Sequence, residues 1–353
     1  MQLIAAAVLL EFVLRIYNPV PIRVRGNEIV LPVKQVYTFD NGFTHKIDRT
    51  TVHTKNALGF RGPDPPADFA GRLTIVTIGG STTEGLFLSD GRTWTDAMAR
   101  RLEPEFPGVW VNNAGIDGHT TFGHLILLKS FIVRLRPKVA LFLVGANDVG
   151  LDRAGTFDEG VLPAAGGLRF AANAVAEHSE LISVVWNLVR AARARARGLG
   201  HSEIDLQTVE RRGVAPAVLE ETEREYRQYL PGYAERLGQI ADLTRANGIT
   251  AVWITQPALF GDSIDPTTGV DLAMVKVNGR GNGHLEWRLL EMNNDVLRRV
   301  AGERGIPLID LANELPKDSR YFYDFLHFTN EGSEKVGEIV ARGLGPILQK
   351  IAR

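Results

Sequence analysis

The stretch TIVTIGGSTTEG, residues 74–85, decides how this chain is interpreted. Its first five residues favour a β-strand, which the apolar side chains among them would bury. Two glycines, Ser81 and two threonines follow directly. The strand is therefore predicted to end in a tight turn that carries a hydroxyl group, and this turn suits a phosphate-binding loop, a nucleophile or an ordinary loop.

Spacing excludes three familiar motifs around Ser81. A Walker loop requires G-x-x-x-x-G-K-[ST] and the dinucleotide fingerprint requires G-x-G-x-x-G, and neither is present. The nucleophile elbow of α/β-hydrolases requires G-x-S-x-G, but Thr83 occupies the place of its second glycine. Taken alone, Ser81 is better explained as a strand-to-loop residue or a helix N-cap than as a catalyst.

Composition bounds the architecture and the chemistry. The chain has 353 residues, of which 44% are apolar, enough for one sizeable domain or two small ones. Its 40 basic and 41 acidic residues give no global attraction toward nucleic acid. The absence of cysteine excludes disulfides and thiol nucleophiles. Composition leaves the oligomeric state undetermined.

The amino-terminal segment, residues 1–18, is the part of the chain that bears on location. Its apolar run, residues 3–14, contains Glu11 and is shorter than the roughly 20 residues that span a bilayer. It lacks the flanks of a signal peptide. We expect either a partial membrane anchor or an amphipathic helix packed on the domain. Arg15, Arg23 and Arg25 favour a cytoplasmic carboxyl side by the positive-inside rule.

Residues 19–71 are rich in Pro, Gly, Asn and Asp and predict an irregular lead-in, which we call the lead-in below. Residues 72–353 predict one α/β domain, because β-branched runs alternate with helical patterns. Such alternation indicates a parallel sheet covered by helices on both faces, with ligands bound at the carboxyl ends of the strands. The predicted strands are residues 73–78, 109–112, 139–144, 249–255 and 307–309. The predicted helices are residues 93–102, 122–134, 219–247, 284–304 and 331–351.

One region interrupts the alternation. Residues from about 150 to 217 show no clear strand, and NLVRAARARARG within them favours a helix. We therefore expect a helical cap inserted over the site. Arg190, Arg193 and Arg197 fall on one helical face, which is better explained by solvent exposure than by a polyanion or membrane surface.

Three later segments change the interpretation of Ser81. They are NNAGIDGHTT (112–121), LVGANDVG (143–150) and YDFLHFTNEG (323–332), and each follows or ends a predicted strand or lies in the loop beyond it. A serine nucleophile needs a base, and the base needs a partner that fixes its tautomer. Asp324 and His327, three residues apart, provide both.

These four blocks, in this order, resemble the SGNH or GDSL-like serine hydrolase family. The resemblance covers roughly residues 73–346, with the cap as an insertion, and implies a three-layer α/β/α sandwich with a mainly parallel five-stranded sheet of flavodoxin-like type. It implies the catalytic residues Ser81, Asp324 and His327. The sequence departs from the family at Gly80, where an aspartate is more usual.

The resemblance also implies an oxyanion hole. Asn113 followed by Gly118 matches the second block, which places a backbone donor at Gly118, with Gly115 as the alternative. Asn147 of GAND matches the asparagine whose amide joins the hole, and the N–H of Ser81 is the third donor. Asp148 is expected to be a structural hydrogen-bonding partner.

The implied reaction is acyl transfer through Ser81. His327 would take the serine proton while Asp324 holds the imidazole, and water would then release the acid. A base with a pKa near roughly 6.5 predicts activity that rises from acid toward neutral pH.

Each residue has an ordinary structural alternative, as a cap, a polar turn or a buried histidine, but four such coincidences in order are improbable. Asp310 is a rival acid that we expect to be structural. His119, His124, His178 and His284 lack ligand-like spacing, so neither a metal nor a cofactor is expected. Trp94 is expected to pack in the core rather than to stack on a sugar.

The substrate is left open among carbohydrate O-acetyl groups, short acyl esters and lipids. An O-acyltransferase that uses the same acyl-enzyme and a non-catalytic carbohydrate-binding protein are the alternatives. NALGFRG, residues 56–62, is similar to lead-ins of bacterial members with an amino-terminal membrane helix. It favours the cell envelope, as a membrane-anchored or periplasmic protein, over the cytoplasmic alternative.

Overall fold

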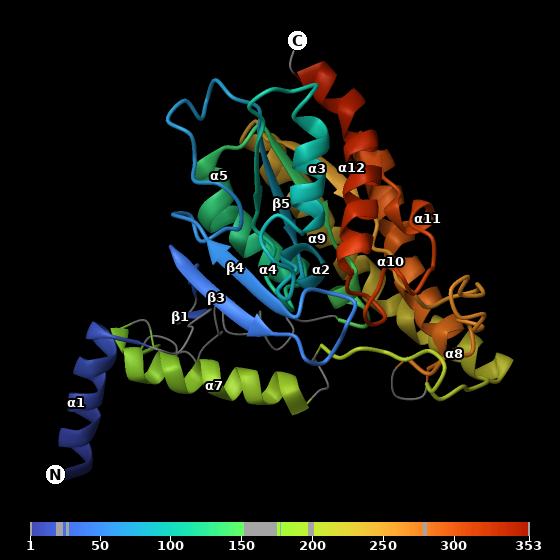
Figure 1. Cartoon of the computed structure of the whole chain (residues 1–353), viewed down its shortest axis with the longest axis horizontal. Helices are drawn as coiled ribbons and strands as arrows, with labels where there is room; N and C mark the ends of the chain where they lie inside the picture. The colour runs from blue at the N-terminus through green and yellow to red at the C-terminus, as the bar shows by residue number, and fades with distance from the viewer. Residues whose placement is uncertain are drawn as a thin grey trace.

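A five-stranded parallel sheet forms the centre of the computed structural model (Figure 1). The structure describes residues 2–18, 24–25, 28–151, 175–176, 178–196, 201–277 and 281–351. All five predicted strands are confirmed to within one residue at each end. They are β5 (Thr74–Gly79), β6 (Trp110–Asn113), β7 (Val139–Leu143), β8 (Thr250–Ile254) and β9 (Leu308–Ile309).

The strand order determines where a site forms. The order is β6-β5-β7-β8-β9, and every pairing is parallel. In chain order this is the 2-1-3-4-5 arrangement, in which the direction of winding reverses between β5 and β7. The loops that follow β5 and β7 therefore diverge at this point and leave a crevice, and these loops carry Ser81 and Asn147.

Helices cover both faces of the sheet, as predicted (Figure 1). On one face, α3 (Trp94–Leu102) and α12 (Asn330–Ile351) pack with each other and with one core cluster. On the other face lie α4 (Thr121–Leu127), α9 (Leu230–Ala246) and α10 (Gly283–Arg304). Because side chains alternate along a strand, Ile75 joins the first core and Val76 joins the second. The α/β/α sandwich is thus confirmed, and Trp94 is buried in its core.

Two predicted helices are interrupted. The segment predicted as one helix over 122–134 contains a π-helical turn, η1 (Leu128–Ile132), before α5 (Val133–Leu135). The segment over 219–247 divides into α8 (Pro216–Tyr226), η4 (Arg227–Tyr229) and α9. Pro231 lies in the first turn of α9, where its missing N–H is tolerated but the preceding helix cannot continue unbroken. Short turns near the strand ends are α2 (Ser81–Glu84), η2 (Ala146–Asp148) and α11 (Leu311–Glu314).

The lead-in is more regular than expected. Its described residues form two antiparallel ribbons, β1 (Val24–Arg25) with β2 (Glu28–Ile29) and β3 (Gln35–Asp40) with β4 (Thr50–Lys55). The β3–β4 ribbon packs beside the sheet domain, and Phe39 contacts Phe87 edge to face with ring centroids 5.3 Å apart. The ribbon is therefore attached to the loop that follows α2.

The amino-terminal helix α1 (Gln2–Ile16) extends away from the sheet and contacts α7 (Glu180–Ala196) (Figure 1). The Glu11 carboxylate accepts hydrogen bonds from the N–H groups of Glu180 and Leu181 and from Ser179 Oγ. These bonds, led by that of Leu181, lower the pKa of Glu11 to about 2. No helix within the described residues has the length and apolar character needed to cross a membrane.

The helical cap stays a prediction, because residues 152–174 and 197–200 lie outside the described residues. The side chains of Arg190, Arg193 and Arg197 lie outside them too. Of the described part, α7 contacts α1 and β1, and residues after it reach the candidate site, as shown below.

Close packing of α3 against α12 gives a first test. A Cβ placed on Gly337 would lie 2.5 Å from Ala97 Cβ and 2.8 Å from the Met98 nitrogen. Gly337→Ala should therefore lower the free energy of unfolding by about 1–3 kcal/mol, measured by urea denaturation. Gly302→Ala in α10, where nothing lies within 4 Å, should be neutral or stabilising by up to about 1 kcal/mol. Equal stability of the two variants would contradict this packing.

Candidate active site

Ser81 lies at the first position of α2, directly after the central strand β5. No side chain fits at Gly79, because a Cβ there would lie 2.2 Å from Thr83 Oγ1 and 2.7 Å from the Leu143 carbonyl oxygen. Gly80 is the N-cap, and its Cβ would lie 2.5 Å from Asn147 Nδ2. The glycine that departs from the family pattern thus leaves room for the Asn147 amide.

Asp324 and His327 belong to one tight loop before α12. A bridge between Phe322 and Phe328 closes this loop, and the Tyr323 N–H donates to the His327 carbonyl at 3.0 Å. Asp324 Oδ1 accepts hydrogen bonds from the N–H groups of Leu326, at 2.8 Å, and His327, at 2.7 Å. The carboxylate is therefore fixed by its own loop.

The structure brings Ser81, His327 and Asp324 into one hydrogen-bonded series. Asp324 Oδ2 lies 2.6 Å from His327 Nδ1, and His327 Nε2 lies 2.7 Å from Ser81 Oγ. With a proton on Nδ1, the imidazole donates to Asp324 and accepts the serine hydroxyl at Nε2. Two side chains 246 residues apart in sequence are thus in direct contact.

The local charges oppose the effect of burial on His327. Burial on its own would lower the pKa of His327, but the charge of Asp324 and its hydrogen bond outweigh burial and raise that pKa above its ordinary value. Burial would raise the pKa of Asp324, whereas the charge and hydrogen bonds of His327 lower it on balance. The pair therefore favours an ionised carboxylate beside an imidazole that accepts a proton readily.

The polar groups predicted for an oxyanion hole lie around Ser81. Asn147 and Ser81 line the same small pocket, and Asn147 Nδ2 donates to the His119 carbonyl at 2.9 Å. Gly118 has φ +74°, a conformation that favours glycine. No acceptor among the described residues bonds the Gly118 N–H. The alternative donor, the Gly115 N–H, is already bonded to Asn113 Oδ1 at 2.9 Å.

The two other aspartates considered in the sequence lie elsewhere. Asp148 is buried and accepts bonds from the Thr121 N–H and hydroxyl and from Arg236, which agrees with a structural position. Burial raises the pKa of Asp148 despite these partners. Asp310 is bonded to Arg298 and Thr255, so the rival acid does not contact His327.

The spacing of the histidines led us to expect no metal site, and the structure brings together one group of side chains of the metal-ligating type. Within the described residues, His201, Asp324 and His327 have possible ligand atoms within 4.8 Å of one another. These side chains already bond protein partners, since His201 Nδ1 lies 2.7 Å from the Tyr323 hydroxyl and His327 bonds Asp324 and Ser81. His284 is bonded to Asp262 on the surface.

His201 lies beside His327, and sequence reasoning missed it. Its ring centroid lies 4.1 Å from that of His327, and its Nε2 lies 3.8 Å from Asp117 Oδ1. Tyr323 stacks on His327 at 5.5 Å and 12°. His201 lies within the region predicted as a cap, about 150–217, and no spacing relates it to the other blocks, so no sequence signal marked it.

Comparison with known proteins agrees with this geometry. The model of the GDSL-like Lipase/Acylhydrolase family matches residues 77–335. The chain belongs to this family, and it is a hydrolase that acts on ester bonds.

The individual proteins similar to this chain share a quarter or less of their aligned residues with it. The chain is 25% identical to the esterase TesA of Pseudomonas aeruginosa over 206 residues. The alignment covers 56% of this chain and 89% of that protein. A crystal structure of TesA is similar at 17% identity and a TM-score of 0.42, covering 77% of this chain and 98% of that one. Axe2, an acetylxylan esterase from Geobacillus stearothermophilus, is similar at 17% identity and a TM-score of 0.43, covering 80% and 95%.

The charge arrangement predicts the titration of His327. Its pKa, measured by NMR, should lie above roughly 6.5 in the wild type, and kcat/KM should rise with pH through the same value because the base must be neutral to accept a proton. Asp324→Asn should lower this pKa and move the rise to lower pH. Asp310→Asn should leave it unchanged, since Asp310 does not contact His327. If Asp310→Asn lowered the pKa of His327 and Asp324→Asn did not, the assignment of Asp324 as the orienting acid would be wrong.

Proposed function

We propose that this enzyme hydrolyses a carboxylic ester with a short acyl group through an acyl-enzyme on Ser81. The observation that carries the proposal is the hydrogen-bonded series Asp324–His327–Ser81 at the crevice between β5 and β7. A nucleophile, a base in contact with it and an acid that orients the base are the groups that acyl transfer requires.

The reaction proceeds in two steps. Ser81 Oγ forms a bond to the acyl carbon while its proton passes to His327 Nε2, and the alcohol leaves with that proton. Water then gives a proton to His327 and attacks the acyl carbon, which releases the acid and restores the Ser81 hydroxyl. Asp324 stabilises the imidazolium in both steps.

The negative oxygen of each tetrahedral intermediate needs donors that are already in place. We assign this role to the N–H groups of Ser81 and Gly118 and the side-chain amide of Asn147. Ser81 opens α2, and the first N–H groups of a helix have no acceptor within the helix. Asn147 Nδ2 donates a hydrogen bond to the carbonyl oxygen of His119, the residue after Gly118. This bond connects the two segments that carry the Asn147 and Gly118 donors.

The size of the pocket supports a short acyl group. The pocket that contains Ser81 and Asn147 has a volume of about 10 Å³ and is also lined by Leu143, Gln256 and Leu326. This is about the room that one water molecule requires. Acetyl is the smallest of the candidate acyl groups, so a pocket this small favours carbohydrate O-acetyl or other short acyl esters over long-chain lipids.

Acyl release from p-nitrophenyl acetate and butyrate tests the proposal. Ser81→Ala and His327→Ala should each lower kcat by more than about 10⁴-fold. Asn147→Ala should lower it by about 10²–10³-fold, with folding unchanged by circular dichroism. His284→Ala, a surface histidine bonded to Asp262, is the matched control and should retain wild-type activity. Full activity of folded Ser81→Ala would contradict the proposed nucleophile.

Analysis of the acyl products, with and without a sugar acceptor, separates hydrolysis from transfer. If product analysis with a sugar acceptor shows the acyl group on the sugar in preference to free acid, the enzyme is an acyltransferase. Free acid as the main product supports the esterase.

We also propose that α1 places the enzyme at the cell envelope. This helix exposes four large apolar side chains, each between 62% and 71% exposed: Ile4, Val8, Leu9 and Phe12. Exposed apolar area of this kind favours a lipid interface.

Flotation with phosphatidylcholine vesicles tests this location. The wild type should float with the vesicles, and Leu9→Glu with Phe12→Glu should abolish flotation, because a charged face does not enter the acyl region. Val36→Glu, an exposed apolar residue of β3, should float like the wild type. A wild type that stays with the unbound fraction would contradict the membrane contact.

A further inference from the structure

Two basic side chains of the lead-in, Lys55 and Arg61, are buried beside the helix that begins with Ser81. Lys55, the last residue of β4, is 8% exposed, and Arg61 is 3% exposed. Buried Lys and Arg side chains are unfavourable unless they are paired and hydrogen-bonded. Both find their partners in the segment that begins with Ser81.

Arg61 holds the carboxyl end of α2, the helix that Ser81 opens. Its Nη1 donates to the carbonyl oxygens of Glu84, at 2.9 Å, and Gly85, at 2.6 Å, and its Nη2 donates to that of Leu88 at 2.7 Å. These carbonyls lie at and beyond the end of the helix, where they lack helical partners and favour a cation. The short helix is therefore fixed at the end opposite the nucleophile.

Lys55 acts on the neighbouring loop through Glu84. Lys55 Nζ lies 3.0 Å from Glu84 Oε1, and Glu84 Oε2 accepts the Asp117 N–H at 2.7 Å. Asp117 directly precedes Gly118, whose N–H we assign to the oxyanion hole. One carboxylate thus joins the helix of Ser81 to the loop of Gly118.

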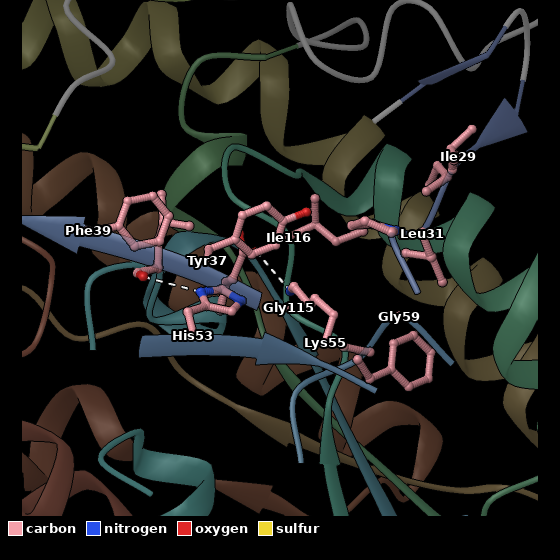
Figure 2. A pocket seen from close by; sticks show the side chains of 15 residues that line it. Ile29, Leu31, Tyr37, Phe39, His53, Lys55, Gly59, Gly115 and Ile116 are labelled. Atoms are coloured by element: carbon pink, nitrogen blue, oxygen red, sulfur yellow. Dashed lines mark hydrogen bonds and ion pairs between the residues drawn. The ribbon is translucent and has the colours of Figure 1, made fainter. Parts of the chain in front are cut away.

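The surroundings strengthen this link. Lys55 and Glu84 line a largely apolar cavity of about 200 Å³ between the lead-in and the sheet domain (Figure 2). Its walls include Leu31, Tyr37 and Phe39 of the lead-in and Ile116 of the loop before Gly118. Both side chains of the pair are less than a tenth exposed, so the effective dielectric around them is lower than in water.

We propose that Lys55 and Glu84 are positioning residues of the active site, which hold the Gly118 N–H in place for the oxyanion. The proposal rests on the function proposed above. Oxyanion donors must lie within about 2.7–3.1 Å of the developing charge, and a displacement of about 1 Å can cost about 10²-fold in rate. The Asp117–Glu84 bond restrains the backbone of the loop one residue before this donor.

Two variants separate positioning from simple stability. Glu84→Ala removes the acceptor for Asp117, whereas the double variant Lys55→Met with Glu84→Gln keeps an acceptor and buries no net charge. Glu84→Ala should lower kcat for p-nitrophenyl acetate by about tenfold or more, with KM nearly unchanged, because the interaction acts on the transition state. The double variant should retain kcat within about threefold of the wild type.

A transition-state analogue gives the readout that a structural role would not move. A short-chain trifluoromethyl ketone forms an adduct with Ser81 that places an oxyanion in the hole, so its affinity should fall in Glu84→Ala by the same factor as kcat/KM. Arg49→Met, which removes an exposed ion pair with Asp40 on the same ribbon, is the control and should change neither value.

Either of two outcomes overturns the proposal. One is a folded Glu84→Ala with wild-type kcat and analogue affinity, and the other is a double variant that loses as much activity as Glu84→Ala. An inactive wild type, or a fully active Ser81→Ala, would instead refute the proposed function itself. The two failures are therefore distinguishable in one set of assays.

Discussion

The parallel pairing of β5 with β7 is the constraint on which the site depends. Gly79 is paired with Leu143, so the two strands end at the same level of the sheet. Ser81 and Asn147 then follow within two and four residues of those ends and line one pocket. Residues that follow the carboxyl ends of neighbouring strands need no long loops to meet, because the backbone hydrogen bonds of the sheet already fix the distance between the two strands.

His327, the proposed base, comes from near the carboxyl end of the chain, and its loop is held by local hydrogen bonds. Asp324 uses one oxygen for two N–H groups of its own loop and the other for the imidazole. Asp324 therefore fixes the backbone that carries His327 as well as the tautomer of its ring. Packing of α12 on α3 keeps this loop over the crevice, since α12 begins at Asn330, directly after it.

Support for the site also comes from outside the region that matches the family. The family model begins at residue 77, whereas Lys55 and Arg61 lie in the lead-in. Their bonds to Glu84, Gly85 and Leu88 cross the boundary predicted at residue 72. The lead-in contributes interior cations to this domain, so the predicted boundary separates stretches of different composition whose side chains pack together.

The sequence predicted structural features that depend on local patterns better than features that depend on contacts between distant residues. The five strands were located to within one residue because β-branched runs bounded by glycine and polar residues define them locally. Ser81, Asn147, Asp324 and His327 were predicted because four blocks occur in order. Lys55, Arg61 and His201 were missed because charged and histidine side chains usually lie at the surface, and only folding shows that they are buried or stacked.

Covalent labelling of the folded wild type with a fluorophosphonate, followed by mass spectrometry of its peptides, tests the central claim most directly. A serine activated by a histidine attacks the phosphorus and keeps the label. We expect one label per chain, on the peptide that contains Ser81, and almost none in His327→Ala. A folded wild type that takes no label, or takes it on a different serine, would contradict the assignment of Ser81 as the nucleophile.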